Sequence, residues 1–299
     1  MLNLIRAEWF KLVRRPMAWV LLIVLLALLM MVRLVEFMAV ALHDGTFTGG
    51  GIRSSLLDEA QVQQFRLQIT FPGIFGAVLS HMNGVGGICA IILAAGLLGS
   101  EYSWGTLRTQ LARQPDRGRY LAAKVIALQM ALLAGILIGL VFGAGLALAF
   151  GGLLGNVGAV RAADLGALPL AALRALYVML PYVMFTIAGC VIGRSVLAGA
   201  AAGFMFLVLD VGLGALSFLA NLGGVLAVLV NLVVQPNINT LVVLNSRSFG
   251  LDPTVLTPSL DLTTLPSPLQ ATLVVGAYSA LFGFYAYQAL TRRDITGPA

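Results

Sequence analysis

Six long apolar runs constrain this chain more than any other feature of its sequence. Each run is long enough to cross a lipid bilayer as an α-helix, which takes about 20 mostly apolar residues. The runs cover approximately residues 17–41, 73–99, 120–150, 169–193, 196–217 and 269–290. The sequence therefore predicts an all-α integral membrane protein with six transmembrane helices.

The composition supports a membrane protein and argues against a soluble one. Hydrophobic residues make up 60% of the 299 positions and charged residues only 10%, whereas soluble domains carry about 25% charged residues. The formal net charge of +6 does not indicate a nucleic-acid-binding protein, because the cations lie in short patches between apolar runs rather than along one soluble basic face. We therefore predict a single membrane domain and no nucleic-acid partner.

The distribution of lysine and arginine predicts how the chain is oriented, because the cytosolic loops of membrane proteins carry an excess of these residues. If the N-terminus is cytosolic, the same side holds Arg6, Lys11, Arg14, Arg15, Arg108, Arg113, Arg117, Arg119, Lys124, Arg194, Arg292 and Arg293. The remaining cations, outside or near the outer interface, are Arg33, Arg53, Arg66, Arg161, Arg174 and Arg247. Both termini are therefore predicted to be cytosolic, with a cytosolic loop at residues 100–119, in a multi-pass protein of the cell membrane.

Two longer segments between the spans are predicted to be external loops, at residues 43–72 and 218–268. Within the first, residues 56–70 have a pattern suited to a short surface helix. Within the second, residues 219–234 are apolar but short and are interrupted by asparagine and glycine. We interpret them as a re-entrant or interfacial piece, and the alternative is a seventh span. Prolines in the rest of this segment predict a loop with turns.

The first 15 residues form an amphipathic pattern that is typical of a helix in the headgroup plane of a membrane. Its apolar face would hold Leu2, Ile5, Trp9, Leu12 and Val13, and its polar face Asn3, Arg6, Glu8, Lys11, Arg14 and Arg15. Pro16 then marks a bend into the first span. Two interpretations stay open: a membrane anchor alone, or an anchor whose polar face also touches a cytosolic partner.

The stretch between the second and third spans predicts a short amphipathic cytosolic helix. Trp104, Leu107 and Leu111 share one helical face, and Arg108 and Arg113 lie off it. A carboxylate, that of Glu101, stands at the start of the helix, where the helix dipole favours a negative charge. The simpler interpretation is a basic loop that only sets the topology.

Several of these residues resemble those of the ABC-2 type transporter permeases. In the loop they are Glu101, Gly105, Thr106, Leu111, Pro115, Arg119 and Lys124. Near the N-terminus they are Glu8, Trp9, Phe10, Lys11 and Leu12, followed by Arg14, Arg15 and Pro16, and later in the chain Gly193, Arg194 and Ser195. The six-span layout with cytosolic ends is also similar, whereas residues 218–268 depart from many members of the family.

The resemblance implies a division of labour between chains. Such permeases pair two six-span units, identical or related, with two cytosolic ATPase subunits that bind ATP and Mg²⁺. Residues 1–15 would be an elbow helix, and residues 16–299 a single transmembrane domain. The helix after the second span would be a coupling helix that docks on the ATPase, with Trp104, Leu107 and Leu111 as its apolar docking face. By position, the whole contact set would be Glu101, Trp104, Gly105, Thr106, Leu107, Arg108, Leu111 and Arg113.

The chain has no Walker A motif, which requires a lysine after glycine in a phosphate-binding loop. Lys11 follows Phe10, and Lys124, the second of the two lysines, follows Ala123. We therefore predict that this chain is not an enzyme, holds no cofactor or metal, and relies on a separate ATPase.

Ionisable residues at membrane depth are functional candidates by default. Asp210 falls in the outer half of the fifth span, Arg174 near the outer start of the fourth, and Arg33 and Glu36 in the outer part of the first at a spacing that allows them to pair. One hypothesis is an outer gate in which Asp210 binds Arg174 or Arg33. The alternative is a static pair that fixes helix packing.

The sequence thus favours the membrane subunit of an ATP-driven bacterial inner-membrane transporter, in contact with membrane lipids. Its apolar walls favour export of an amphiphilic, lipid-like, drug-like or peptide-like substrate. One rival is an ion-coupled secondary transporter, against which the few buried ionisable groups argue. Another is a membrane assembly or sensor protein that transports nothing.

Overall fold

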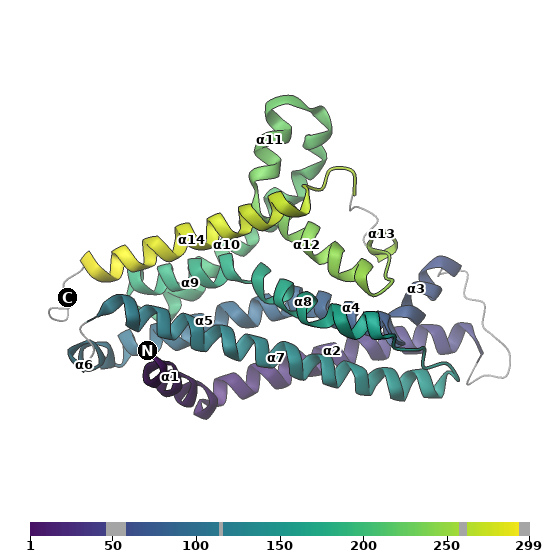
Figure 1. The fold of residues 1–299 in the computed structure, drawn as a ribbon, viewed down its shortest axis with the longest axis horizontal. Coiled ribbons are helices and arrows are strands. Elements are labelled where there is room, and N and C mark those ends of the chain that lie inside the picture. The colour runs from purple at the N-terminus through teal and green to yellow at the C-terminus, as the bar shows by residue number, and fades with distance from the viewer. Residues whose placement is uncertain (46–57, 114–115, 257–261, 293–299) are drawn as a thin grey trace.

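A computed structural model describes residues 1–45, 58–113, 116–256 and 262–292, and these residues are almost entirely helical (Figure 1). The helices are α1 (Leu2–Arg14), α2 (Pro16–His43), α3 (Glu59–Ile69), α4 (Gly73–His81), α5 (Gly87–Ser103), α6 (Thr106–Arg113), α7 (Arg117–Leu153), α8 (Ala162–Val178), α9 (Leu180–Gly193), α10 (Val196–Gly214), α11 (Gly224–Leu232), α12 (Val234–Ser248), α13 (Pro253–Leu256) and α14 (Pro268–Arg292). A π-helix, η1 (Met82–Gly86), joins α4 to α5, and a 3₁₀ helix, η2 (Ala215–Leu222), follows α10.

All six predicted spans fall on helices long and apolar enough to cross a membrane, so this prediction is confirmed. These helices are Pro16–His43, Gly73–Ser103, Arg117–Leu153, Ala162–Gly193, Val196–Leu219 and Pro268–Arg292. The second runs through η1 without stopping, and the fourth is divided between α8 and α9 near Pro181. Length and composition thus identify the spans, while local chemistry decides where each one bends.

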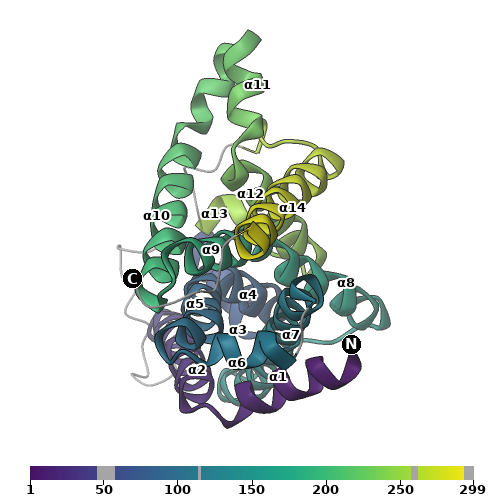
Figure 2. The same cartoon turned by 90° about the vertical axis from the view of Figure 1, so that its left-hand side faces the viewer.

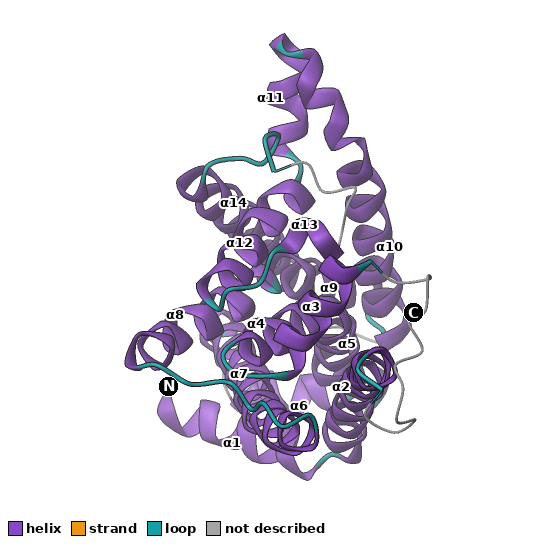
Figure 3. Ribbon diagram, turned by 90° about the vertical axis from the view of Figure 1, so that its right-hand side faces the viewer, coloured by secondary structure: helices purple, strands orange, loops and turns teal. Residues whose placement is uncertain are grey.

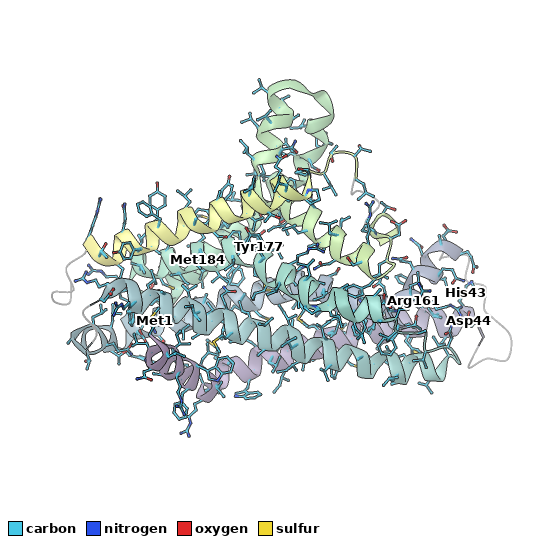
Figure 4. All side chains as sticks on the ribbon, viewed as in Figure 1. Met1, His43, Asp44, Arg161, Tyr177 and Met184 are labelled. Atoms are coloured by element: carbon cyan, nitrogen blue, oxygen red, sulfur yellow. The ribbon has the colours of Figure 1, made fainter. Side chains whose placement is uncertain are left out.

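The helices run back and forth along the long axis of the molecule, and the start of α1, α6 and the end of α14 lie at one end (Figure 1). Met1 marks that end, and His43, Asp44 and Arg161 mark the opposite one (Figure 4). The turn between α9 and α10 belongs to the first end, because Val196 packs against Gly99 near the end of α5. The described residues of the predicted cytosolic patches therefore share one end of the bundle.

Several close contacts between helices depend on glycine. A Cβ atom on Gly199 of α10 would lie 2.0 Å from the sulfur of Cys190 on α9, and one on Gly143 of α7 would lie 2.4 Å from Val78 on α4. Small residues allow transmembrane helices to approach closely enough for backbone and side chains to interlock. Not every glycine of the second and third spans allows such a contact, since a Cβ atom on Gly84 or Gly135 would have no neighbouring atom within 4 Å.

The far end of the bundle carries α3, which occupies part of the predicted loop 43–72. The predicted helix at residues 56–70 is confirmed over Glu59–Ile69, and residues 56 and 57 lie outside the described part of the chain. Asp58 begins it with a capping box, and Arg66 binds Asp44 at 2.7 Å. The helix is therefore fixed to the end of α2 rather than free at the surface (Figure 3 views this end).

The predicted loop at residues 218–268 is wrong in its central part, because α12 is a packed helix there. Its polar side chains are satisfied inside the protein: Asn237 donates to the carbonyl of Asn231 at 2.8 Å, and Asn245 to that of Ala171 at 3.0 Å. A polar sequence was taken for a loop because hydrogen bonds of this kind cannot be read from periodicity. The chain bends by 70° between α11 and α12, so these two helices do not form one straight seventh span.

Candidate functional site: the junction of the N-terminal helix and the charged loop

The N-terminal helix α1 packs directly on the other helices of the bundle. Figure 2 shows α1 across the end of the molecule where α6 and the start of α7 also lie. Its apolar residue Leu12 is buried, with 4% of its surface exposed. Its acidic residue Glu8 is also buried, with 5% exposed, which the sequence did not predict. The sequence pattern placed Glu8 on the polar face of this helix, pointing away from the bundle. That placement is wrong, because Glu8 points towards Lys124 of α7.

Glu8 belongs to a buried charge cluster that also contains Lys11, Glu101 and Lys124. The ammonium nitrogen of Lys124 lies 2.7 Å from Oε2 of Glu8 and 2.6 Å from Oε1 of Glu101. Lys11 binds Glu8 at 2.6 Å and approaches Glu101 at 3.6 Å. The four charges come from α1, the end of α5 and the start of α7, so the cluster ties three helices together.

Hydroxyl and amide groups complete this charge cluster. The Tyr120 hydroxyl donates to Oε2 of Glu101, and the Gln110 side chain of α6 donates to Oε1 of the same carboxylate at 3.0 Å. Lys124 also lies 5.0 Å from the centre of the Tyr120 ring. Two carboxylates facing two ammonium groups are neutral as a set, which is how buried charges become tolerable.

The electrostatics of α1 follow from these neighbours. Burial alone would raise the pKa of Glu8, but Lys124 and Lys11 favour the carboxylate and hold its pKa below the ordinary 4.5. Glu8 is therefore negatively charged at neutral pH. Its attraction to Lys124 holds α1 on the bundle.

A second set of contacts surrounds Arg15, at the bend between α1 and α2. Its guanidinium donates to the carbonyl of Gly96 at 3.0 Å and to the Ser100 hydroxyl at 2.9 Å, and it lies 5.2 Å from the Trp104 ring. Gly105 follows with a φ of +67°, a left-handed conformation that lets the chain turn out of α5 and begin α6. Hydrogen bonds from Arg15 thus connect the bend at Pro16 directly to the end of α5, where the loop between the second and third spans begins.

The apolar face of α6 points inward, which corrects the predicted docking face. Leu107 is 4% exposed and Leu111 is 7% exposed, and both pack into the protein's own core, whereas Trp104 is 68% exposed. The spacing identified one helical face correctly, but spacing does not say what covers that face. Among residues 103–112 whose exposure the structure describes, the exposed ones are Ser103, Trp104, Gly105, Thr106, Thr109 and Ala112.

Glu101 is likewise not an outward contact residue, since it is 1% exposed and held inside the charge cluster. Backbone at Arg108 and Arg113 belongs to α6, and their side chains lie outside what the structure describes. The signal that could have revealed the cluster is the rarity of lysine: Lys11 and Lys124 are the two lysines of the chain, and both are in it.

The candidates for an outer gate do not assemble into one. Arg33 binds Glu36 at 2.7 Å, as their spacing predicts, and also Gln68 of α3 at 2.7 Å. Asp210 instead accepts hydrogen bonds from the Tyr182 hydroxyl at 2.6 Å and from the backbone N–H of Gln235 at 2.9 Å. Among the described residues, no ion pair joins Asp210 to Arg174 or Arg33.

Asp210 therefore has different partners from the ones predicted. The N–H group of Gln235 belongs to the first turn of α12, where backbone donors lack a partner within the helix. A carboxylate in that position satisfies such a donor and complements the helix dipole. Asp210 thus holds the start of α12, just after the bend. This capping could not be foreseen while α12 was taken for a loop.

Comparison with known families places most of the chain. Residues 2–254 match the model of a family described as ABC-2 family transporter protein. Neither a curated protein nor a solved structure matched the chain.

Proposed function

Since this chain belongs to the ABC-2 transporter family, a family of transporter permeases, we propose that it is the membrane subunit through which a separate ATPase drives export of an amphiphilic molecule. The observation that carries the proposal is the buried charge cluster of Glu8, Lys11, Glu101 and Lys124. It joins the loop that would meet the ATPase to the spans that would have to move.

The path for such a motion runs through α6. Gln110 of α6 binds Glu101, which binds Lys124 in α7 and, through it, Glu8 in α1. A push on α6 would therefore reach α1, α5 and α7 together rather than bend one loop. We infer that α1, with residues 1–15, is the elbow helix and α6 the coupling helix of a single transmembrane domain at residues 16–299.

The outer surface of this junction supplies a revised docking face for the ATPase. It consists of Trp104, Gly105, Thr106, Thr109 and Ala112, which are exposed. Leu107 and Leu111 support this face from below. In this proposal two ATPase copies carry ATP and Mg²⁺, and this end of the bundle, with both termini, is cytosolic at the cell membrane.

A second permease, identical or related, would complete the assembly. The segment from the end of α10 through α11 projects from the bundle (Figures 1 and 2). Large apolar side chains are exposed along it, among them Phe218, Val225, Val228 and Leu229. A projecting apolar hairpin of this kind suits contact with another membrane subunit.

Amphiphilic cargo suits the chemistry of the walls. The hollow between α9 and α14 is lined by Phe185, Ile192, Phe282 and Tyr285, with Gln288 and Arg292 at its polar rim. Apolar walls with a polar rim fit a lipid-like, drug-like or peptide-like substrate. Export fits such a cargo, because it can partition into the bilayer before it is taken up.

Co-purification from the native host tests the proposal. The tagged full chain, extracted in mild detergent and analysed by mass spectrometry, should bring down an ABC ATPase in stoichiometric amount. Thr109→Arg combined with Ala112→Arg should abolish this, because two bulky cations would then stand on the proposed docking face. Ala162→Arg combined with Ala163→Arg is the matched control, since both residues are exposed helical alanines at the opposite end.

The alternatives predict other results. If no ATPase appears even after cross-linking, and reconstituted protein transports with a proton or sodium gradient alone, the chain is an ion-coupled transporter. An assembly or sensor protein would show neither the ATPase nor transport. Capture that survives the docking-face substitutions would move the interface away from α6.

A further inference from the structure

An apolar cavity of about 300 Å³ lies where α1 and α2 meet η1, α5 and α7. Its wall includes Trp9 and Val13 from α1, Trp19 from α2, Gly86 from η1, and Ala134 and Gly135 from α7. None of the side chains that line it carries a charge, a hydroxyl or an amide group. The cavity is therefore suited to hydrocarbon and to nothing that needs a hydrogen bond.

The cavity is open towards the surroundings of the bundle. Trp19 is 51% exposed and Ile138, also in the wall, is 41% exposed. A Cβ atom on Gly135 would meet no atom within 4 Å, so this part of α7 faces open space. Since α2 and α7 are membrane-spanning helices, hydrocarbon chains of the bilayer are what this opening meets.

The exposed charges of α1, which borders the cavity, are positive. Glu8 is the one acidic residue of α1, and it is buried and neutralised by Lys11 and Lys124. Arg6 is exposed and stands one helical turn before Trp9 of the cavity wall, at the i, i+3 spacing that makes two residues neighbours on a helix. Arg14 is also exposed, but it stacks on the Phe10 ring at 4.3 Å, on another face of α1. The helix that borders the cavity thus presents cations without a compensating carboxylate.

We propose that this cavity binds one acyl chain of an anionic phospholipid, whose headgroup lies against Arg6. The apolar wall selects the acyl chain, and the uncompensated cations of α1 select the negative headgroup. The tryptophans Trp9 and Trp19 stand at the boundary between the two, where indole rings are favoured in membranes. This site is independent of any ATPase and goes beyond the proposed transport function.

A bound lipid of this kind would stabilise the position of α1. It would fill the space between α1 and α7 on the side that faces the bilayer, while the charge cluster holds α1 from the other side. Anionic lipid would then act as a structural ligand of the junction, bound whether or not cargo is transported.

Tryptophan quenching by brominated lipid tests the proposal in reconstituted full-length protein. Trp104→Phe leaves Trp9 and Trp19 as the two tryptophans, because the chain contains three. Vesicles of phosphatidylcholine with a small fraction of phosphatidylglycerol carry bromine either on the phosphatidylglycerol chains or on an equal fraction of phosphatidylcholine. We expect severalfold more quenching in the first case, since a selective site concentrates the anionic lipid next to both rings.

Two substitutions on α7 separate the cavity from the rest of the lipid-facing surface. Gly135→Phe fills the cavity and should abolish the excess quenching by brominated phosphatidylglycerol. Gly145→Phe is the matched control and should leave it unchanged, because Gly145 lies on the same helix, outside the cavity wall, and also meets no atom within 4 Å.

Arg6→Gln keeps the proposal testable if Gly135→Phe fails to fold. Removing one cation near an anionic membrane should weaken the selective component about fivefold. Equal quenching by the two brominated lipids in the unsubstituted protein overturns the proposal, as does an excess that survives Gly135→Phe. An excess that Arg6→Gln does not reduce overturns the assignment of the headgroup.

Discussion

The two ends of this molecule both bury charged side chains, and they do so differently. At the α1 end, both carboxylate oxygens of Glu8 and of Glu101 have a partner, and Lys124 lies between the two acids. At the α3 end, Arg33 binds Glu36 and Gln68, but among the described residues its Nε has no hydrogen-bond partner, and neither does Nε2 of Gln68.

The difference teaches where the bundle is held tightly. Fully satisfied buried networks rigidify a structure, whereas a buried polar atom without a partner costs about 1–3 kcal/mol. The α1 end is therefore the firm coupling between α1, α5, α6 and α7. The α3 end is the looser one and should tolerate rearrangement at a lower cost.

The largest effect is expected from Lys124→Met, which leaves two buried carboxylates with only Lys11. Breaking a buried ion pair in this way costs about 3–5 kcal/mol, so the variant should unfold at a much lower temperature in detergent. Lys124→Met combined with Glu101→Gln should recover part of the loss, because one uncompensated charge is then removed. A single variant as stable as the unsubstituted protein would show that the charge cluster does not couple the helices.

A smaller effect is expected from Arg33→Met at the opposite end. It leaves Glu36 without its cation but removes a group that was already incompletely bonded, so we expect a loss of about 1–3 kcal/mol in the same thermal assay. Arg33→Met with Glu36→Gln is the control and should be less destabilised than the single variant. If Arg33→Met costs more than Lys124→Met, the order of the two ends is reversed.

The next effect concerns α12, which Asp210 caps. Asp210→Ala should cost about 1–2 kcal/mol and raise hydrogen exchange at the start of α12, because the cap is lost. Asp210→Asn should cost less, since an amide oxygen can still accept from the Gln235 N–H group. If Asp210→Asn abolished transport while α12 stayed protected, the gate hypothesis would regain support.

The smallest effect is expected from protonation of Glu8, which occurs only in acid and leaves stability at neutral pH unchanged. Its pKa is lowered in the folded protein, so its contribution is complete above the ordinary 4.5 and is lost as pH falls through the lower folded value. Hydrogen exchange of α1 should therefore increase on acidification below about pH 4.5. Glu8→Gln should remove this step, and a step that persists in that variant would have to come from another carboxylate.

Sequence reasoning identified the spans because apolar length is a local property. All six spans and the helix at Glu59–Ile69 follow from runs and periodicity. The residues of the charged loop were also singled out, and Glu101 and Lys124 prove to be partners. Their pairing with Glu8 was missed, because it joins residues more than 90 positions apart and no local pattern records such a contact.

The remaining errors have a common physical cause. The inward face of α6, with Leu107 and Leu111, and the buried helix α12 both depend on which neighbour covers a given side chain. An amphipathic pattern shows that one face of a helix is apolar. It does not show whether a partner protein or the protein's own core buries that face. Asp210 was assigned to an arginine for the same reason, since a backbone N–H group leaves no trace in the sequence.

The π-helix η1 sets the rotation of α5 about its own axis, and so the direction in which each side chain of α5 points. Each residue turns an α-helix by about 100°, and a π-helical segment commonly carries one residue more than the regular helix would. The orientation of Glu101 towards Lys124 therefore depends on residues 82–86, which lie more than ten positions before it. Deleting one residue there would turn the carboxylate away from its partner by about a quarter turn. In this protein, the rotation of one span about its axis links Met82 and Gly86 in the wall of the apolar cavity to the ion pair that holds α1.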